Sequence, residues 1–127
     1  MRRPTLALML LVTVAPLASA DVVDIKWSDQ GHFSHKGTIA AGKLVEVCGK
    51  LSAGNKIRWD FEVSTPVDFN VHYHEGKAVV MPIVRDKTRA DAGVFAPPAA
   101  QDYCLMWEAG AAGALIDYRV RLRAAGT

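Results

Sequence analysis

The chain has 127 residues, which is enough for one small domain and too few for two. Its 15 Lys and Arg residues and 13 Asp and Glu residues give a formal net charge of +2. Two of the arginines lie in the first three positions, so the chain from Asp21 onward is formally neutral. A neutral chain gives no electrostatic reason to expect nucleic acid or an anionic membrane as a partner.

The first twenty residues have the pattern of a secretory signal peptide. Arg2 and Arg3 precede an apolar run from Thr5 to Val14, and Ala18-Ser19-Ala20 is a small-residue cleavage signal. We predict cleavage after Ala20, a mature domain spanning residues 21–127, and a periplasmic or secreted protein. No other apolar run approaches about 20 residues, so no membrane span is predicted.

The mature chain is dominated by alternating apolar and polar residues, a pattern typical of strands with one buried face. Strands are predicted at Val22–Trp27, Leu44–Cys48, Ile57–Val63, Val67–Tyr73, Val79–Val84, Gly93–Ala96, Tyr103–Glu108 and Ile116–Leu122. Ser64-Thr65-Pro66 is predicted as a turn, and the charged segment Arg85–Asp91 as a solvated loop. The pattern favours an all-β fold, an antiparallel β-sandwich or jelly roll of about seven or eight short strands.

The apolar half of this alternation contains most of the aromatic residues. They are expected to point inward and form the sandwich core: Trp59, Phe61, Phe69, Tyr73, Trp107 and Tyr118. Burying each such side chain contributes on the order of 1.5–3 kcal/mol.

The two cysteines, Cys48 and Cys104, are predicted to form a disulfide, because an even cysteine count in an exported domain favours one. Two free thiols, or a redox or metal-binding pair, are the alternatives. The second alternative is the weaker, because the cysteines are far apart and neither belongs to a C-x-x-C motif.

The order of motifs resembles the Golgi-dynamics (GOLD) domain. Cys48-Gly-Lys-Leu51 is followed by the strands Ile57–Val63 and Val67–Val71, then by Tyr103-Cys-Leu-Met-Trp-Glu108 and Ile116-Asp-Tyr-Arg-Val120. The resemblance implies a β-sandwich with a disulfide between the two cysteine-bearing strands, and a binding module rather than an enzyme. It implies no ligand-contacting residue.

His72 and His74 are the candidate metal ligands. Side chains two positions apart on a strand share a face, so these two imidazoles are able to converge on one ion. The ion would be copper(II) or zinc, which imidazole favours. His32 and His35 form a second pair, in a segment predicted as a loop, and Glu75 is a further candidate. The alternative is a solvated polar face, because the alternation places both His72 and His74 outward with Asp68 and Asn70.

No catalytic motif is recognisable, whether a G-x-S-x-G, an H-E-x-x-H or a glycine-rich phosphate loop. We therefore predict a small exported binding module with a protein or small-ligand partner. A periplasmic copper(II)- or zinc-binding protein is the first alternative, and an enzyme of unknown class the second.

Overall fold

In the computed structural model, residues 20–124 are described, and they contain seven strands. The strands are β1 (Ala20–Asp24), β2 (His32–Ile39), β3 (Leu44–Leu51), β4 (Lys56–Glu75), β5 (Ala78–Phe95), β6 (Gln101–Ala109) and β7 (Ala114–Arg123). The predicted signal peptide lies outside the described residues except for Ala20, with which β1 begins. Between residues 20 and 124 no helix is long and apolar enough to cross a membrane.

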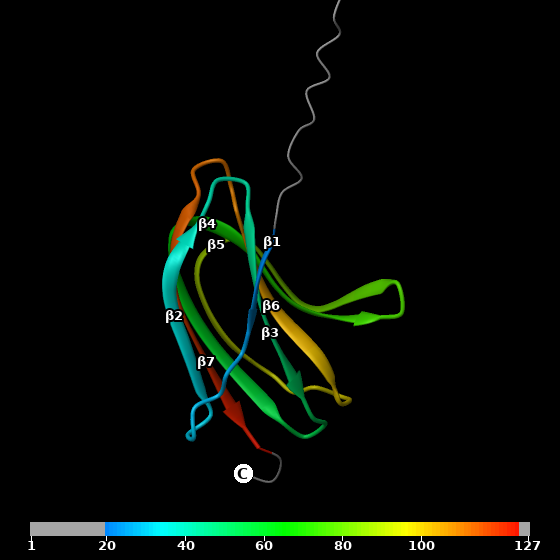
Figure 1. The fold of residues 1–127 in the computed structure, drawn as a ribbon. Helices are drawn as coiled ribbons and strands as arrows, with labels where there is room; N and C mark the ends of the chain where they lie inside the picture. Colours follow the sequence, from blue (N-terminus) through cyan, green and yellow to red (C-terminus); the bar gives the residue numbers. More distant parts are fainter. Residues whose placement is uncertain (1–19, 125–127) are drawn as a thin grey trace, which may run out of the picture.

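The strands form two layers that share β4 (Figure 1). The first half of β4 pairs with β7, whose other edge pairs with β2. The second half of β4 pairs with β6, and β3 and β1 continue that layer. All of these pairs are antiparallel except β1 with β3, which is parallel. The predicted all-β sandwich is thus confirmed, with one parallel pair at the edge of a layer.

Two strands are much longer than predicted. β4 has 20 residues and β5 has 18, and they pair with each other along most of their length. The predicted turn at Ser64–Pro66 is wrong, because β4 continues through it and changes layer there, at a shift in the register. The predicted loop at Arg85–Asp91 is also wrong, because this segment lies inside β5.

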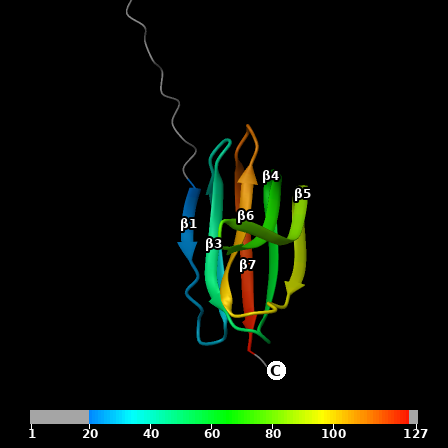
Figure 2. The ribbon, with the colours of Figure 1, turned by 90° about the vertical axis from the view of Figure 1, so that its right-hand side faces the viewer.

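The connected ends of β4 and β5 project away from the layer formed by β1, β3 and β6 (Figures 1 and 2). This hairpin carries the exposed apolar side chains of Val79 and Met81, which retain 48% and 46% of their accessible surface. The two strands pair with each other to the end of this hairpin, and the backbone groups on its outer edges are left to solvent.

Aromatic side chains from both layers fill the space between them. Phe61 contacts Phe69 at 4.8 Å between ring centroids, Phe69 contacts Trp107 at 5.3 Å, and Trp107 stacks on Tyr118 at 4.9 Å. All four are buried, as predicted, as is Trp59, while Tyr73 is partly buried against the same cluster. This chain of rings joins the two layers.

Candidate functional site

The disulfide between Cys48 and Cys104 lies on the outer face of the β3–β6–β4 layer. The two cysteines are directly opposite in the register of β3 and β6, with a Cα–Cα distance of 4.1 Å. His72 is opposite Cys104 in the register of β4 and β6. The predicted disulfide is therefore confirmed, and it places His72 in the same row of side chains across three strands.

His72 and Asn70 are buried on this outer face, although the alternation predicted a solvated position for both. They retain only 2% and 7% of their accessible surface and are the buried polar residues of the described chain. The prediction of a solvated face was wrong here because it assumed that nothing covers the polar side of the strand. Buried polar groups require partners, and these two supply one to each other.

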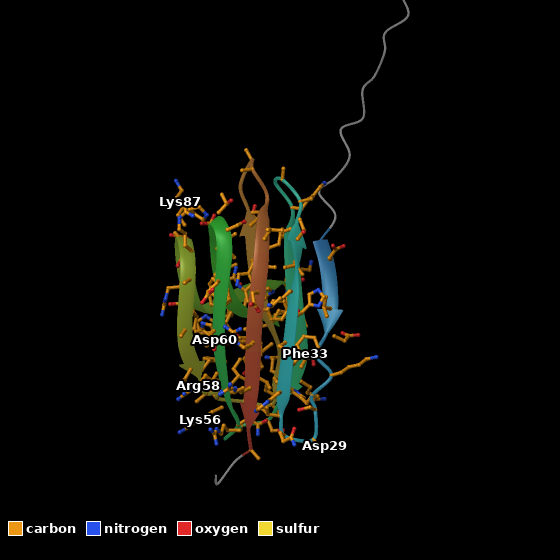
Figure 3. The ribbon with its side chains drawn as sticks, turned by 90° about the vertical axis from the view of Figure 1, so that its left-hand side faces the viewer. Asp29, Phe33, Lys56, Arg58, Asp60 and Lys87 are labelled. Atoms are coloured by element: carbon orange, nitrogen blue, oxygen red, sulfur yellow. A yellow bond between two sulfur atoms is a disulfide. The ribbon has the colours of Figure 1, made fainter. Side chains whose placement is uncertain are left out.

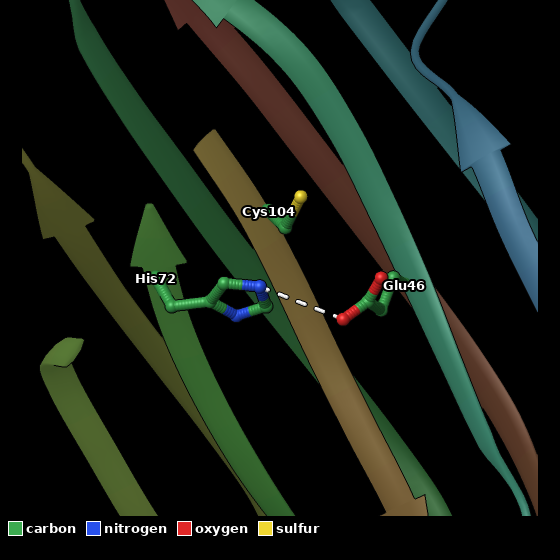
Figure 4. A group of neighbouring side chains, drawn as sticks. All are labelled: Glu46, His72 and Cys104. Carbon is green, nitrogen blue, oxygen red and sulfur yellow. Dashed lines mark ion pairs between the residues drawn. The ribbon is translucent and has the colours of Figure 1, made fainter. Parts of the chain in front are cut away.

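The imidazole of His72 lies between the side chains of Asn70 and Glu46, and Figure 4 shows it facing Glu46. Its Nδ1 lies 2.8 Å from Asn70 Oδ1, and its Nε2 lies 3.5 Å from Glu46 Oε1. Glu46 is on β3, so the ring reaches across β6 to meet it. The arrangement fixes both the position and the orientation of the ring.

Burial lowers the pKa of the His72 imidazole below its ordinary value of 6.5, because desolvation penalises the charged ring. The Glu46 carboxylate opposes this effect and raises the pKa, while His74 adds to the lowering. The neutral ring is therefore favoured at neutral pH, with one nitrogen carrying a proton and the other an unshared electron pair.

The other three histidines occupy different surroundings. His74 is exposed on the same face, with its ring centroid 5.4 Å from that of His72. His32 and His35 lie in β2 and not in a loop as predicted; they are opposite Arg121 and Tyr118 of β7, in the other layer. The four imidazoles therefore do not converge. Within the described residues, the one group of three or more potential metal ligands is Glu46, His72 and Cys104.

Glu46 is the member of this site that the sequence alone did not identify. The alternation in β3 places it on the same face as Cys48, two positions away. The predicted disulfide could have indicated that β3, which carries Glu46, lies beside β6. It could not have indicated that β6 also pairs with β4, and that second pairing brings Glu46 and His72 together.

A second polar surface lies on the outer face of the β4–β7 pair, at the end where Lys56 and Arg58 are found (Figure 3). Arg58 is directly opposite Arg121, and Lys56 is directly opposite Arg123. We call these four exposed residues the basic end. Among the ion pairs of residues 20–124, none involves any of the four.

The next pair along the same two strands behaves differently. Arg119 donates a hydrogen bond to Asp60 and also pairs with Asp117, and these acids raise the pKa of its guanidinium. The two strands thus pair Arg119 with acidic residues, whereas the four residues of the basic end make no ion pair within residues 20–124. Like charges directly opposite each other destabilise a sheet, so the basic end opposes folding.

A cavity of about 340 Å³ opens between the edge strands of the two layers, where β2 faces β1 and β3. His35, Lys43 and Tyr118 contribute to its lining. The Tyr118 hydroxyl is buried without a hydrogen-bond partner among the described residues, and burial raises its pKa to about 12. The cavity is an opening of the sandwich at its unclosed edge.

No family model and no curated protein matches the chain. The resemblance to the GOLD domain therefore remains a prediction from the sequence.

Solved structures share the fold. PliG from Aeromonas hydrophila, a periplasmic lysozyme inhibitor of g-type lysozyme, matches with 14% identity and a TM-score of 0.63, covering 82% of this chain and 97% of PliG. A mutant of the Escherichia coli PliG matches with 13% identity and a TM-score of 0.60, covering 83% and 100% of the two chains. The Yersinia pseudotuberculosis-derived mitogen matches with 8% identity and a TM-score of 0.56, covering 71% and 84%. Proteins with different names share this architecture. The likeness therefore shows the fold, and the function has to be inferred from the sites of this chain.

Proposed function

We propose that this protein is exported to the periplasm and binds another protein there, acting as a binding module and not as an enzyme. The basic end of β4 and β7 is the observation that carries the proposal. Its four cationic side chains lie side by side on one sheet face and make no ion pair within the described chain. Such a surface is costly for the folded protein alone and is complementary to a surface rich in carboxylates.

The comparisons support the choice of partner to test. The chain shares its fold with PliG proteins over nearly all of their length, and these are named as periplasmic inhibitors of g-type lysozyme. Glycosidases of the lysozyme type cleave their substrate with carboxylate side chains. We therefore propose a g-type lysozyme, bound through its acidic groups, as the protein partner.

Measuring the affinity of the exported protein for a g-type lysozyme by calorimetry, at low and at physiological salt, tests the proposal. Arg58→Glu combined with Arg121→Glu should weaken binding at least about tenfold, and the parent's affinity should fall as the salt concentration rises. Lys77→Glu changes an exposed charge at the tip of the β4–β5 hairpin and serves as the matched control, with affinity close to that of the parent.

The two levels of the proposal fail separately. Absence of binding by the parent protein would reject lysozyme as the partner. Binding that is insensitive to both the double substitution and salt would leave lysozyme as the partner but reject the basic end as the contact surface. Inhibition of cell-wall lysis by the same variants should follow their affinities.

A further inference from the structure

Glu46, Asn70 and His72 form a cluster on the outer face of the β3–β6–β4 layer, which the proposed protein binding does not use. In this cluster the Nε2 of His72 and a carboxylate oxygen of Glu46 face each other. Their separation is 3.5 Å, longer than an ordinary charge-assisted hydrogen bond. His72 is buried, whereas the Glu46 side chain retains 23% of its accessible surface. The pair is therefore fixed on one side and reachable from solvent on the other.

Asn70 determines which nitrogen of the ring is free. Its Oδ1 lies 2.8 Å from His72 Nδ1, and an amide oxygen is only an acceptor, so this contact favours the tautomer in which Nδ1 carries the proton and donates it. The Nε2 of a neutral ring then presents its unshared pair towards the Glu46 carboxylate, which is also an acceptor. Two acceptors in this position require a cation or a proton between them. A hydrogen bond from the distal nitrogen to an amide or carboxyl oxygen is also how metal-binding histidines are usually oriented.

The separation of the two atoms is compatible with a tetrahedral metal site. Ligand atoms at about 2.0–2.1 Å from an ion lie about 3.4 Å apart in a tetrahedral site. Adjacent ligands of a square-planar copper(II) ion at similar bond lengths lie only about 2.9 Å apart. The 3.5 Å between the two atoms is close to the tetrahedral value, and zinc prefers a tetrahedral site, so zinc is the ion that we propose.

We propose that His72 Nε2 and the Glu46 carboxylate bind a zinc ion, with the exposed His74 as the third protein ligand. The ring centroids of His72 and His74 are 5.4 Å apart, and the proposal requires the His74 side chain to rotate so that one of its nitrogens faces the ion. Cys104 Sγ is close by but is bonded to Cys48, so the protein ligands are two imidazoles and one carboxylate. A solvent molecule completes the tetrahedron.

This proposal is independent of lysozyme binding, and its ligands differ from those of the metal site predicted from the sequence. It replaces the pair His32 and His35 with Glu46, because β2 holds those two histidines in the other layer. Of copper(II) and zinc, the two metals that imidazole ligands favour, it names zinc as the ion to test.

Titration of the metal-free exported protein with zinc chloride, followed calorimetrically, tests the site. We expect one ion per chain. Glu46→Gln should weaken zinc binding at least about tenfold, and His72→Gln at least as much, since each removes a ligand. His74→Ala should weaken it less. The combined change His32→Ala and His35→Ala is the matched control and should leave affinity unchanged.

Cobalt(II) substitution supplies a second readout. A tetrahedral site gives intense visible absorption bands, which Glu46→Gln should diminish. Glu46 is partly exposed, so this variant should keep the fold, and the thermal unfolding of each variant verifies it.

No zinc binding by the parent, or equal affinity with and without Glu46, would overturn the proposal and leave a proton as the bridge between the two acceptors. Tighter binding of copper(II) with an absorption spectrum of tetragonal geometry would overturn the assignment to zinc.

Discussion

Gly93 lies opposite Trp59 in the register of β5 and β4, and the indole ring occupies the space that a side chain at position 93 would fill. The Trp59 Nε1 donates a hydrogen bond to Asp91 Oδ2 at 3.2 Å, which holds the ring against this part of β5. A small residue at position 93 is therefore a requirement of the core and not of the backbone conformation.

Gly93→Ala is expected to lower the free energy of unfolding by about 1–3 kcal/mol, because the added methyl group forces a packed tryptophan to move. Urea unfolding measures the change. Gly110→Ala is the matched control, since a Cβ there meets no atom within 4 Å, and its unfolding curve should stay close to that of the parent. Equal effects at the two positions would show that the Trp59 ring is free to shift.

Two buried tyrosines should respond differently to loss of their hydroxyl. Tyr103 donates a hydrogen bond to the carbonyl of Ala99 at 2.9 Å, whereas the Tyr118 hydroxyl has no partner in residues 20–124. Tyr103→Phe should cost about 1 kcal/mol of unfolding free energy, and Tyr118→Phe should be neutral or stabilising. A comparable loss in both variants, measured by thermal unfolding, would indicate that water bonds to Tyr118 in the cavity.

Removal of the disulfide should have a large effect on stability. The bonded cysteines are 56 positions apart, and closing a loop of that length stabilises the fold by about 4 kcal/mol in the chain-entropy model. Cys48→Ala combined with Cys104→Ala should lower the unfolding free energy by that order, as measured in urea. The intact mass of the exported protein should gain two alkyl groups only after reduction; alkylation of both thiols without reductant would contradict the bond.

Acidification should destabilise the protein through His72. Its folded-state pKa is lowered, so the unfolded chain binds the proton more readily and the contribution to stability is present above pH 6.5. This contribution is lost as the pH falls from 6.5 through the folded-state pKa. In metal-free buffer, His72→Gln should have a flatter dependence of unfolding free energy on pH than the parent. Parallel curves for the two proteins would mean that another group dominates.

The strongest alternations in the sequence predicted the core and the layers correctly, but not where two strands end. Pro66 lacks a backbone donor and was expected to mark a turn, yet it lies in the stretch of β4 where the register with β5 is interrupted, a place where proline is tolerated. The charged segment Arg85–Asp91 belongs to β5 because an edge strand with solvent beside it accommodates charge.

β2 was missed for a different reason. Its inward positions include His35 and Gly37, so the segment lacks the alternation that marks the other strands. Its pairing with the strongly patterned β7 determines its structure, and this long-range contact is invisible in a local window of sequence.

The outer-face site was predictable only in part. The spacing of His72 and His74 correctly indicated a shared face, but neither the burial of His72 nor the approach of Glu46 follows from spacing. Both depend on the order β3–β6–β4 across the layer. Local pattern determines which way a side chain points, while strand order determines what it meets.

The membership of β4 in both layers has a consequence for how the molecule opens. Neither layer is able to separate without breaking hydrogen bonds to the same strand, so the two should unfold as one cooperative unit. In native-state hydrogen exchange, amides of β6 and β7 should accordingly report the same opening free energy, whereas those at the projecting tip of the β4–β5 hairpin should exchange through smaller local fluctuations.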